Sequence, residues 1–184
     1  MVDAASRFSA AWVLEKEDAE CAIKAIQRAW IRPYGPPKII QCDEQRAFCS
    51  GQFQQFCNQN NIEPWIAPGE AHWKLGVVER RHPVLRKAIE LYLRDNNLPP
   101  GRNSAIQALD HIVPVMNTLS FTRGYTPAQW VLGQNPAEHN SLTADKFNPS
   151  VHHTALTEQE YHDELVRRNT ARVAFLKALS LIHI

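Results

Sequence analysis

Three acidic residues that lie far apart in the sequence carry the chemistry this chain could perform. Asp3 and Asp43 each stand at the end of a segment that we expect to be a strand, and Glu79 stands near the start of a long helical pattern. If the two strands are neighbours in one sheet, their ends lie about 5 Å apart, and a helix packed on the sheet can bring Glu79 to the same point. Carboxylate oxygens are the ligands that Mg²⁺ and Mn²⁺ prefer. We therefore predict a Mg²⁺ or Mn²⁺ site held by these three side chains.

Such a site would suit the chemistry of phosphodiesters. Two divalent cations about 3.5–4 Å apart hold a phosphate between the attacking and leaving oxygens. Three crowded carboxylates repel one another without cations, so we expect the metal-free site to be disordered or sensitive to protonation. Each acid also has an ordinary structural explanation, since an Asp such as Asp3 is often a turn residue and Asp43 could simply end a strand.

Helices and strands alternate along the chain as this arrangement requires. Short apolar runs at 7–14, 38–42 and 62–67 predict strands, the last at a sheet edge because Pro64 cannot donate to a ladder. Recurring apolar residues predict helices at 18–30, with Asp18 as the cap, and at 52–60, 76–96, 104–119 and 158–178. A short helix should start at Pro127, and Pro83 should kink the helix that carries Glu79.

The last helix has an apolar stripe of its own. We expect that stripe to face the core, and it consists of Tyr161, Leu165, Val173 and Leu176. The final six residues, 179–184, resemble a translated sequencing adaptor, and we expect them to be non-native.

Overall charge does not indicate a polyanionic partner, because the formal net charge is only +1. Between Lys74 and Arg94, however, six basic residues oppose two acidic ones, Glu79 and Glu90. Taken alone, this stripe is typical of a solvated helix face. It becomes a candidate DNA-binding surface because Glu79 lies on the same helix.

The remaining composition indicates an ordinary folded protein, 44% hydrophobic and 21% charged. The four cysteines form no CxxC pair, which argues against a disulfide framework. No apolar run approaches the roughly 18 residues of a membrane span, and no signal-peptide pattern is present. We expect a soluble protein of the nucleus or cytoplasm without a membrane partner.

Four blocks of sequence, in this order and spacing, resemble the integrase catalytic core of retroviruses and long-terminal-repeat retrotransposons. They are VDAASRF at 2–8, GPPKIIQCD at 35–43, residues 53–62, and APGEAHWKLGVVERRHPVLR at 67–86. The most specific is the run Gly76 to Arg80, placed after Asp43 at the family's characteristic interval. A further stretch, 116–136, is similar to the segment that follows the core in retrotransposon polyproteins.

The resemblance implies an α/β, RNase H-like fold, in which helices flank a mixed sheet, here with a truncated N-terminal strand and a C-terminal helical extension. It implies a reaction in which a 3′-hydroxyl of the element's DNA attacks a target phosphodiester. Asp3, Asp43 and Glu79 then correspond to the catalytic, metal-binding triad. The expected DNA contacts are Lys74, Arg80, His82 and Arg86, and the expected partners are the element's DNA ends, the target DNA and further copies of the protein.

We divide the chain on this basis into residues 1–96 as the catalytic core, 97–150 as post-core helices and loop, and 151–184 as the C-terminal helix. Only two residues precede Asp3, so most of its strand is absent, and we expect the chain alone to be inactive or weakly active. Glu44, Leu75 and Pro83 also depart from the family pattern.

Two other functions stay open. A degenerate core would bind nucleic acid through an RNase H-like domain without cutting it. An RNase H-type nuclease would cleave RNA in hybrids, but that class spaces its acids differently, and the run Gly76 to Arg80 argues against it.

Overall fold

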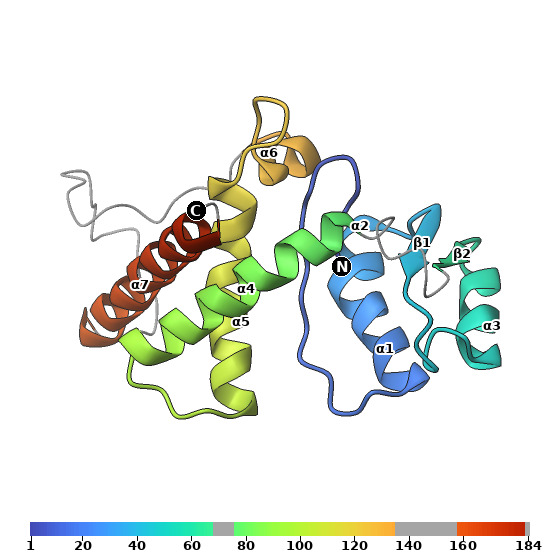
Figure 1. Ribbon diagram of the computed structural model, residues 1–184, viewed down its shortest axis with the longest axis horizontal. Helices are drawn as coiled ribbons and strands as arrows, with labels where there is room; N and C mark the ends of the chain where they lie inside the picture. The colour runs from blue at the N-terminus through green and yellow to red at the C-terminus, as the bar shows by residue number, and fades with distance from the viewer. Residues whose placement is uncertain (68–75, 135–157, 183–184) are drawn as a thin grey trace.

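The computed structural model describes residues 1–67, 76–134 and 158–182 (Figure 1). The described part is mostly helical, with one small sheet of two parallel strands, β1 (Ile39–Cys42) and β2 (Glu63–Ile66). The sheet lies beside α1 and α3 at one end of the molecule, and α4, α5 and α7 pack together at the other end (Figure 1). The described part therefore has two regions of buried apolar residues, one around the sheet and one among the long helices.

The sheet region forms where the sequence predicts it. β1 and β2 pair from Ile39 with Glu63 to Cys42 with Ile66, and the helix between them, α3 (Gly51–Gln59), is capped by the Ser50 hydroxyl. The two strands and α3 confirm the predictions for 38–42, 62–67 and 52–60. Their apolar side chains share one core, made of Ile26, Ile40, Cys42, Phe53, Phe56, Cys57 and Ile62.

The first helix is longer than predicted and changes its winding. It runs as α1 (Ala19–Ile26), a π-helical turn η1 (Gln27–Ile31) and α2 (Arg32–Tyr34) without a break. Asp18 caps it by accepting a hydrogen bond from the Cys21 amide at 2.8 Å, as predicted. The wider turn lies directly before Pro33, which has no amide hydrogen to offer a regular helix. The helix ends at Gly35, whose φ of 81° suits glycine.

The predicted strand at 7–14 is wrong. Only one isolated antiparallel pair forms there, between Val2 and Ser9. The Asn117 side chain, which comes from α5 (Arg102–Leu119), satisfies the Ser9 backbone: its Oδ1 accepts from the Ser9 amide and its Nδ2 donates to the Ser9 carbonyl, both at 2.8 Å. An amide side chain thus makes the two bonds that a neighbouring strand would make, and in the described chain the antiparallel pairing continues beyond Ser9 only through the backbone bonds between Met1 and Ala10.

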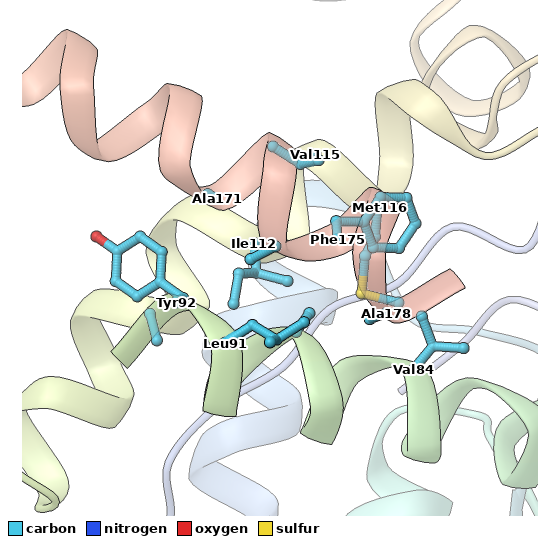
Figure 2. Packing of buried hydrophobic residues seen from close by; sticks show 12 residues of the cluster. Val84, Leu91, Tyr92, Ile112, Val115, Met116, Ala171, Phe175 and Ala178 are labelled. Carbon is cyan, nitrogen blue, oxygen red and sulfur yellow. The ribbon is translucent and has the colours of Figure 1, made fainter. Parts of the chain in front are cut away.

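The second core lies among α4 (Gly76–Asp95), α5 and α7 (Glu158–Ile182), and Figure 2 shows its side chains pointing toward one another. Tyr92, Ile112 and Phe175 are almost completely buried at its centre. Apolar residues recur on one face of each helix, which is why the three helices associate. The remaining buried members are Val84, Ala88, Leu91, Ala108, Val115, Met116, Ala171, Ala174 and Ala178.

A short helix, α6 (Pro127–Leu132), follows α5 and starts at the proline that the sequence indicated. Thr126 and Gln129 form a reciprocal capping box, in which each side chain accepts a hydrogen bond from the other residue's amide, at 3.1 and 2.9 Å. Gly133 ends the helix with a φ of 74°. Both ends of this short helix are therefore encoded locally.

The expected core stripe of the last helix is wrong. Val173 and Leu176 are 37% and 53% exposed, whereas Ala171, Ala174 and Ala178 are fully buried beside Phe175. The reason is close packing, since alanine lets two helix backbones approach where larger side chains would hold them apart. Tyr161, the first residue of the expected stripe, has a side chain outside the described part.

The long helices also bear on other expectations. α4 and α5 continue through Pro83 and Pro114, and a kink at Pro83 stays a prediction. α4 shares its core with α5 and α7, so the predicted boundaries near 97 and 151 separate elements that pack together. Residues 179–182 continue α7. Among the described helices, none is long and apolar enough to cross a bilayer.

Replacing Asn117 with alanine should destabilise the fold strongly. The change leaves the buried amide and carbonyl of Ser9 without partners, at about 1–3 kcal/mol for each. We expect the free energy of unfolding, measured by urea denaturation, to fall by about 2–4 kcal/mol. Asn58→Ala, at an exposed position of α3, serves as the control and should change it by less than about 0.5 kcal/mol. Equal effects of the two substitutions would contradict the role given to Asn117.

Enlarging a side chain on the alanine face of α7 should destabilise the fold more than truncating the exposed Leu176. Ala174→Leu inserts three carbons into a fully buried contact, and overpacking of this kind costs about 1–3 kcal/mol. Leu176→Ala removes a side chain that is half exposed and should cost clearly less. The melting temperatures of the two variants test which face of α7 is buried. If the stripe that the sequence suggested were buried, Leu176→Ala would lower the melting temperature more than Ala174→Leu.

Candidate functional site

Asp3 lies in a tight turn at the start of the chain. Its Oδ2 accepts hydrogen bonds from the Ser6 amide at 2.7 Å and from the Ser6 hydroxyl at 2.6 Å. Its backbone amide donates to the Phe8 carbonyl at 2.8 Å, and its carbonyl accepts from the Arg7 amide at 3.0 Å. In this structure the Asp3 carboxylate therefore organises the reversal of the chain between Val2 and Ser9.

Asp43 stands directly after β1, at the edge of the sheet where both parallel strands end. The ladder closes just before it, with a bond of 2.8 Å from the Ala67 amide to the Cys42 carbonyl. Asp43 is half-buried, and Glu44 beside it is exposed. The carboxyl end of a parallel sheet is the usual location of functional groups in α/β folds. The prediction that Asp43 follows a strand is confirmed, but the strand is buried on one face only, at Ile40 and Cys42.

Glu79 lies in the first turn of α4 on the exposed side of the helix. The start of α4 is held against the N-terminal segment, because Nη1 of Arg81 donates to the Ser9 hydroxyl at 3.2 Å. Figure 1 shows the N-terminus beside this end of α4. The fold thus brings the neighbourhood of Glu79 and the neighbourhood of Asp3 to the same region.

The three carboxylates nevertheless do not form a metal-binding group here. Across residues 1–67, 76–134 and 158–182, no three His, Cys, Asp or Glu side chains lie close enough together to hold an ion. Their assignment as catalytic metal ligands stays a prediction. What the structure adds is a difference among them, since the oxygens of Asp3 already serve a turn, whereas Asp43 lies at the sheet edge and Glu79 on an exposed helix face.

The predicted DNA contacts lie along α4. Arg80, His82 and Arg86 are exposed, and His82 and Arg86 follow Glu79 at three and seven residues, which places them on its side of the helix. Lys74, and Leu75 beside it, fall outside the described residues. Farther along the helix the basic residues are paired: Lys87 with Glu90 at 3.0 Å and Arg94 with Asp95 at 2.8 Å. The available positive charge on α4 is therefore concentrated near Glu79.

The sequence alone does not single out Arg7 and Arg81 as candidate functional residues. Arg81 belongs to the basic stripe between Lys74 and Arg94, but it is half-buried and its guanidinium group reaches the N-terminal segment. Burial, and then the charge of Arg7, lower the pKa of Arg81. The signal was its helical position, because Arg81 lies four residues before Leu85 on the apolar side of α4.

A separate hollow of about 400 Å³ opens between the N-terminal segment, the first helix, α5 and α6. Apolar side chains line most of it, among them Phe8, Trp12, Tyr34 and Leu132. None of the three candidate carboxylates lines it. The hollow and the candidate site are therefore different places on the molecule.

Comparisons with known proteins support the predicted similarity to integrase cores. Residues 1–68 match the integrase core domain family. The catalytic core of HTLV-2 integrase, solved in complex with magnesium in a trimeric form, is 27% identical, with 71% of this chain and 80% of that chain covered and a TM-score of 0.57. The chain is similar to retroviral integrase catalytic cores. The RNase H-like fold of those cores, predicted from the sequence, is thereby confirmed.

Two further relatives extend the comparison. The catalytic core of BIV integrase is 22% identical and covers 66% of this chain and 76% of that one, at a TM-score of 0.53, which supports the fold. The Pol-related polyprotein of mouse intracisternal A-particle MIA14 is 30% identical over 115 residues, or 59% of this chain. The chain spans 13% of the length of that polyprotein.

The cysteine before Asp43 should be chemically inert in the folded protein. Burial, reinforced by the charge of Asp43, raises the pKa of Cys42 from 9.0 to about 12, and only a thiolate reacts readily. The Cys42 pKa is higher in the folded state than in the unfolded state. The contribution of the protonated thiol to the stability of the fold is therefore fully present below pH 9 and is lost as the pH rises toward 12. At pH 8, mass spectrometry should show that iodoacetamide modifies exposed Cys49 and spares Cys42 until urea unfolds the chain. Equal rates in the folded state would contradict this.

Proposed function

We propose that this chain contributes to a retroelement integrase that joins the 3′-hydroxyl of the element's DNA to a target phosphodiester with the help of a divalent metal. The observation that carries the proposal is the similarity to retroviral integrase cores together with the position of Asp43 at the carboxyl edge of the sheet. Glu79 in the first turn of α4 supports it, because α4 starts beside the N-terminal segment. DNA integration is the function that these features favour jointly.

Carboxylate oxygens are suitable ligands for magnesium, but the positions of these side chains in the described structure do not form a magnesium site. Asp43 and Glu79 would be the principal ligands, with Asp3 as the third. The side chains do not gather into a group in this structure, and Asp3 would have to exchange its bonds with Ser6 for a metal. When bound, magnesium would stabilise the charge that develops on the attacking and leaving oxygens.

The residues of α4 would bind and orient the DNA. Arg80 and Arg86 present exposed guanidinium groups, whose forked donors match phosphate oxygens. His82 lies one turn before Arg86 on the same side of α4 and would add a third contact, and Lys74 is included from the sequence alone. Contacts of this type position a duplex without reading its sequence. The proposed partners are the DNA ends of the element and the target, held by more than one copy of the protein.

Substitution of the carboxylates tests the proposal. In a protein completed with the remaining integrase segments, strand transfer between labelled oligonucleotides would be followed with Mg²⁺ or Mn²⁺. Asp43→Asn and Glu79→Gln should each reduce joining to background, because an amide is a poor substitute for an anionic ligand. Glu90→Gln, on an exposed part of the same helix, is the matched control and should keep activity. Full activity of Asp43→Asn or Glu79→Gln would reject the assignment.

Asp3 needs its own comparison, because it has an alternative role. If Asp3 is a ligand, Asp3→Asn should abolish joining while Ser6→Ala leaves it intact. If Asp3 serves only the turn, both substitutions should lower the free energy of unfolding by similar amounts, about 1–2 kcal/mol, and joining should persist at low temperature. Urea denaturation and strand transfer on the same samples separate the two results.

A second candidate function is nucleic-acid binding by a core that no longer reacts. The observation that favours it is the absence of a gathered acid cluster among the described residues. Such a protein should bind a DNA duplex with an affinity that falls with salt, and Arg80→Gln or Arg86→Gln should reduce the salt slope by about one. Binding without joining in the completed protein, at any concentration of Mg²⁺ or Mn²⁺, would favour this function over the first.

A further inference from the structure

Two arginines meet at Ser9, where the N-terminal turn joins the start of α4: the Ser9 hydroxyl donates to the Arg7 carbonyl at 3.3 Å and accepts from Arg81. Arg81 lies two residues after Glu79, which places it roughly on the opposite side of the helix. Its Nη1 donates to the hydroxyl of Ser9, a buried residue, at 3.2 Å. This arginine is therefore directed into the junction between two segments, away from the exposed basic side of α4.

Arg7 is held in the same junction by the backbone of the turn. Its φ of 66° lies in the left-handed region, which disfavours residues that have a Cβ. The turn imposes this conformation, because the Arg7 amide donates to the Asp3 carbonyl at 3.0 Å and the Asp3 amide donates to the Phe8 carbonyl at 2.8 Å. Strained conformations of this kind persist where surrounding bonds over-determine them, and they are frequent at functional sites.

The two arginines have no ion-pair partner among the described residues. Nη1 of Arg7 is buried and has no hydrogen-bond partner within the described chain. No carboxylate of the described residues forms an ion pair with Arg7 or Arg81. A guanidinium group cannot give up its proton under ordinary conditions. The junction consequently holds two fixed positive charges and at least one unused donor.

We propose that Arg7 and Arg81, with the Ser9 hydroxyl, form a binding site for a phosphate group. An anion between two guanidinium groups would offset their repulsion and accept the unused donor of Arg7, and planar guanidinium forks match the oxygens of a phosphate. The site is separate from the exposed side chains of Arg80, His82 and Arg86. It does not rest on the proposed function, because free phosphate would occupy it by the same chemistry as a DNA phosphodiester.

Inorganic phosphate is the probe of the site. Titration of the chain with sodium phosphate, against sodium chloride at equal ionic strength, should raise the melting temperature with a saturable curve. Arg81→Gln and Arg7→Gln should each weaken the apparent affinity at least about ten-fold, since each removes charge-assisted hydrogen bonds. Arg28→Gln, at an exposed arginine of η1, is the matched control and should retain the wild-type curve. A phosphate response equal to that of chloride would overturn the proposal.

A measurement on the unmodified protein covers the case in which a variant fails to fold. The side-chain Nε–Hε resonances of Arg7 and Arg81 should shift on phosphate addition, whereas that of Arg28 should not. A short DNA duplex then identifies the source of the phosphate: if the duplex produces the same shifts, the site takes a phosphodiester, and if only inorganic phosphate does, it takes the free anion. Both results support a phosphate site, and unchanged resonances with both probes would exclude it.

Discussion

The burial of one face of α4 is the constraint on which the rest of the structure depends. Val84, Leu91 and Tyr92 pack against α5 and α7 (Figure 2), and each such side chain stabilises the fold by about 1.5–3 kcal/mol when it is buried. Because a helix is rigid, fixing this face fixes the opposite one. Glu79, Arg80 and Arg86 are therefore presented to solvent by the same packing that closes the core.

A second constraint fixes the position of the N-terminal segment. The Asn117 side chain binds both backbone groups of Ser9, and Arg81 binds its hydroxyl. One residue, Ser9, thus connects the N-terminal turn to α5 and to α4. The turn that carries Asp3 and Arg7 is placed by these bonds, which explains how a segment with one isolated strand pair keeps a defined position.

Positive charge is used in two ways in this molecule. On the exposed side of α4 it is solvated, and its contribution to stability is small. Arg7 and Arg81 are instead drawn into a junction, where burial and mutual repulsion lower the pKa of Arg81. The contrast matters for function, because exposed arginines attract a polyanion over a distance, whereas half-buried donors with fixed geometry select an anion of a particular shape.

Local features of the fold could be predicted from the sequence, because local chemistry decides them. Asp18 caps the first helix, Thr126 and Gln129 begin α6, and the apolar run before Asp43 forms β1. Each depends on residues within a few positions of one another. The family resemblance, carried by blocks such as 35–43 and 76–80, also lay in the sequence and led to the RNase H-like fold.

Only the tertiary structure decided which surfaces meet. The buried face of α7 is its alanine face, because close approach to α4 favours small side chains over the larger Val173 and Leu176. Asn117 replaces a strand partner for Ser9 from 108 positions away, and Arg81 turns inward although its neighbours turn outward. These outcomes depend on distances between segments that no periodicity encodes. The same holds for the three carboxylates. The sequence supplies their residue types, and only packing can bring them together.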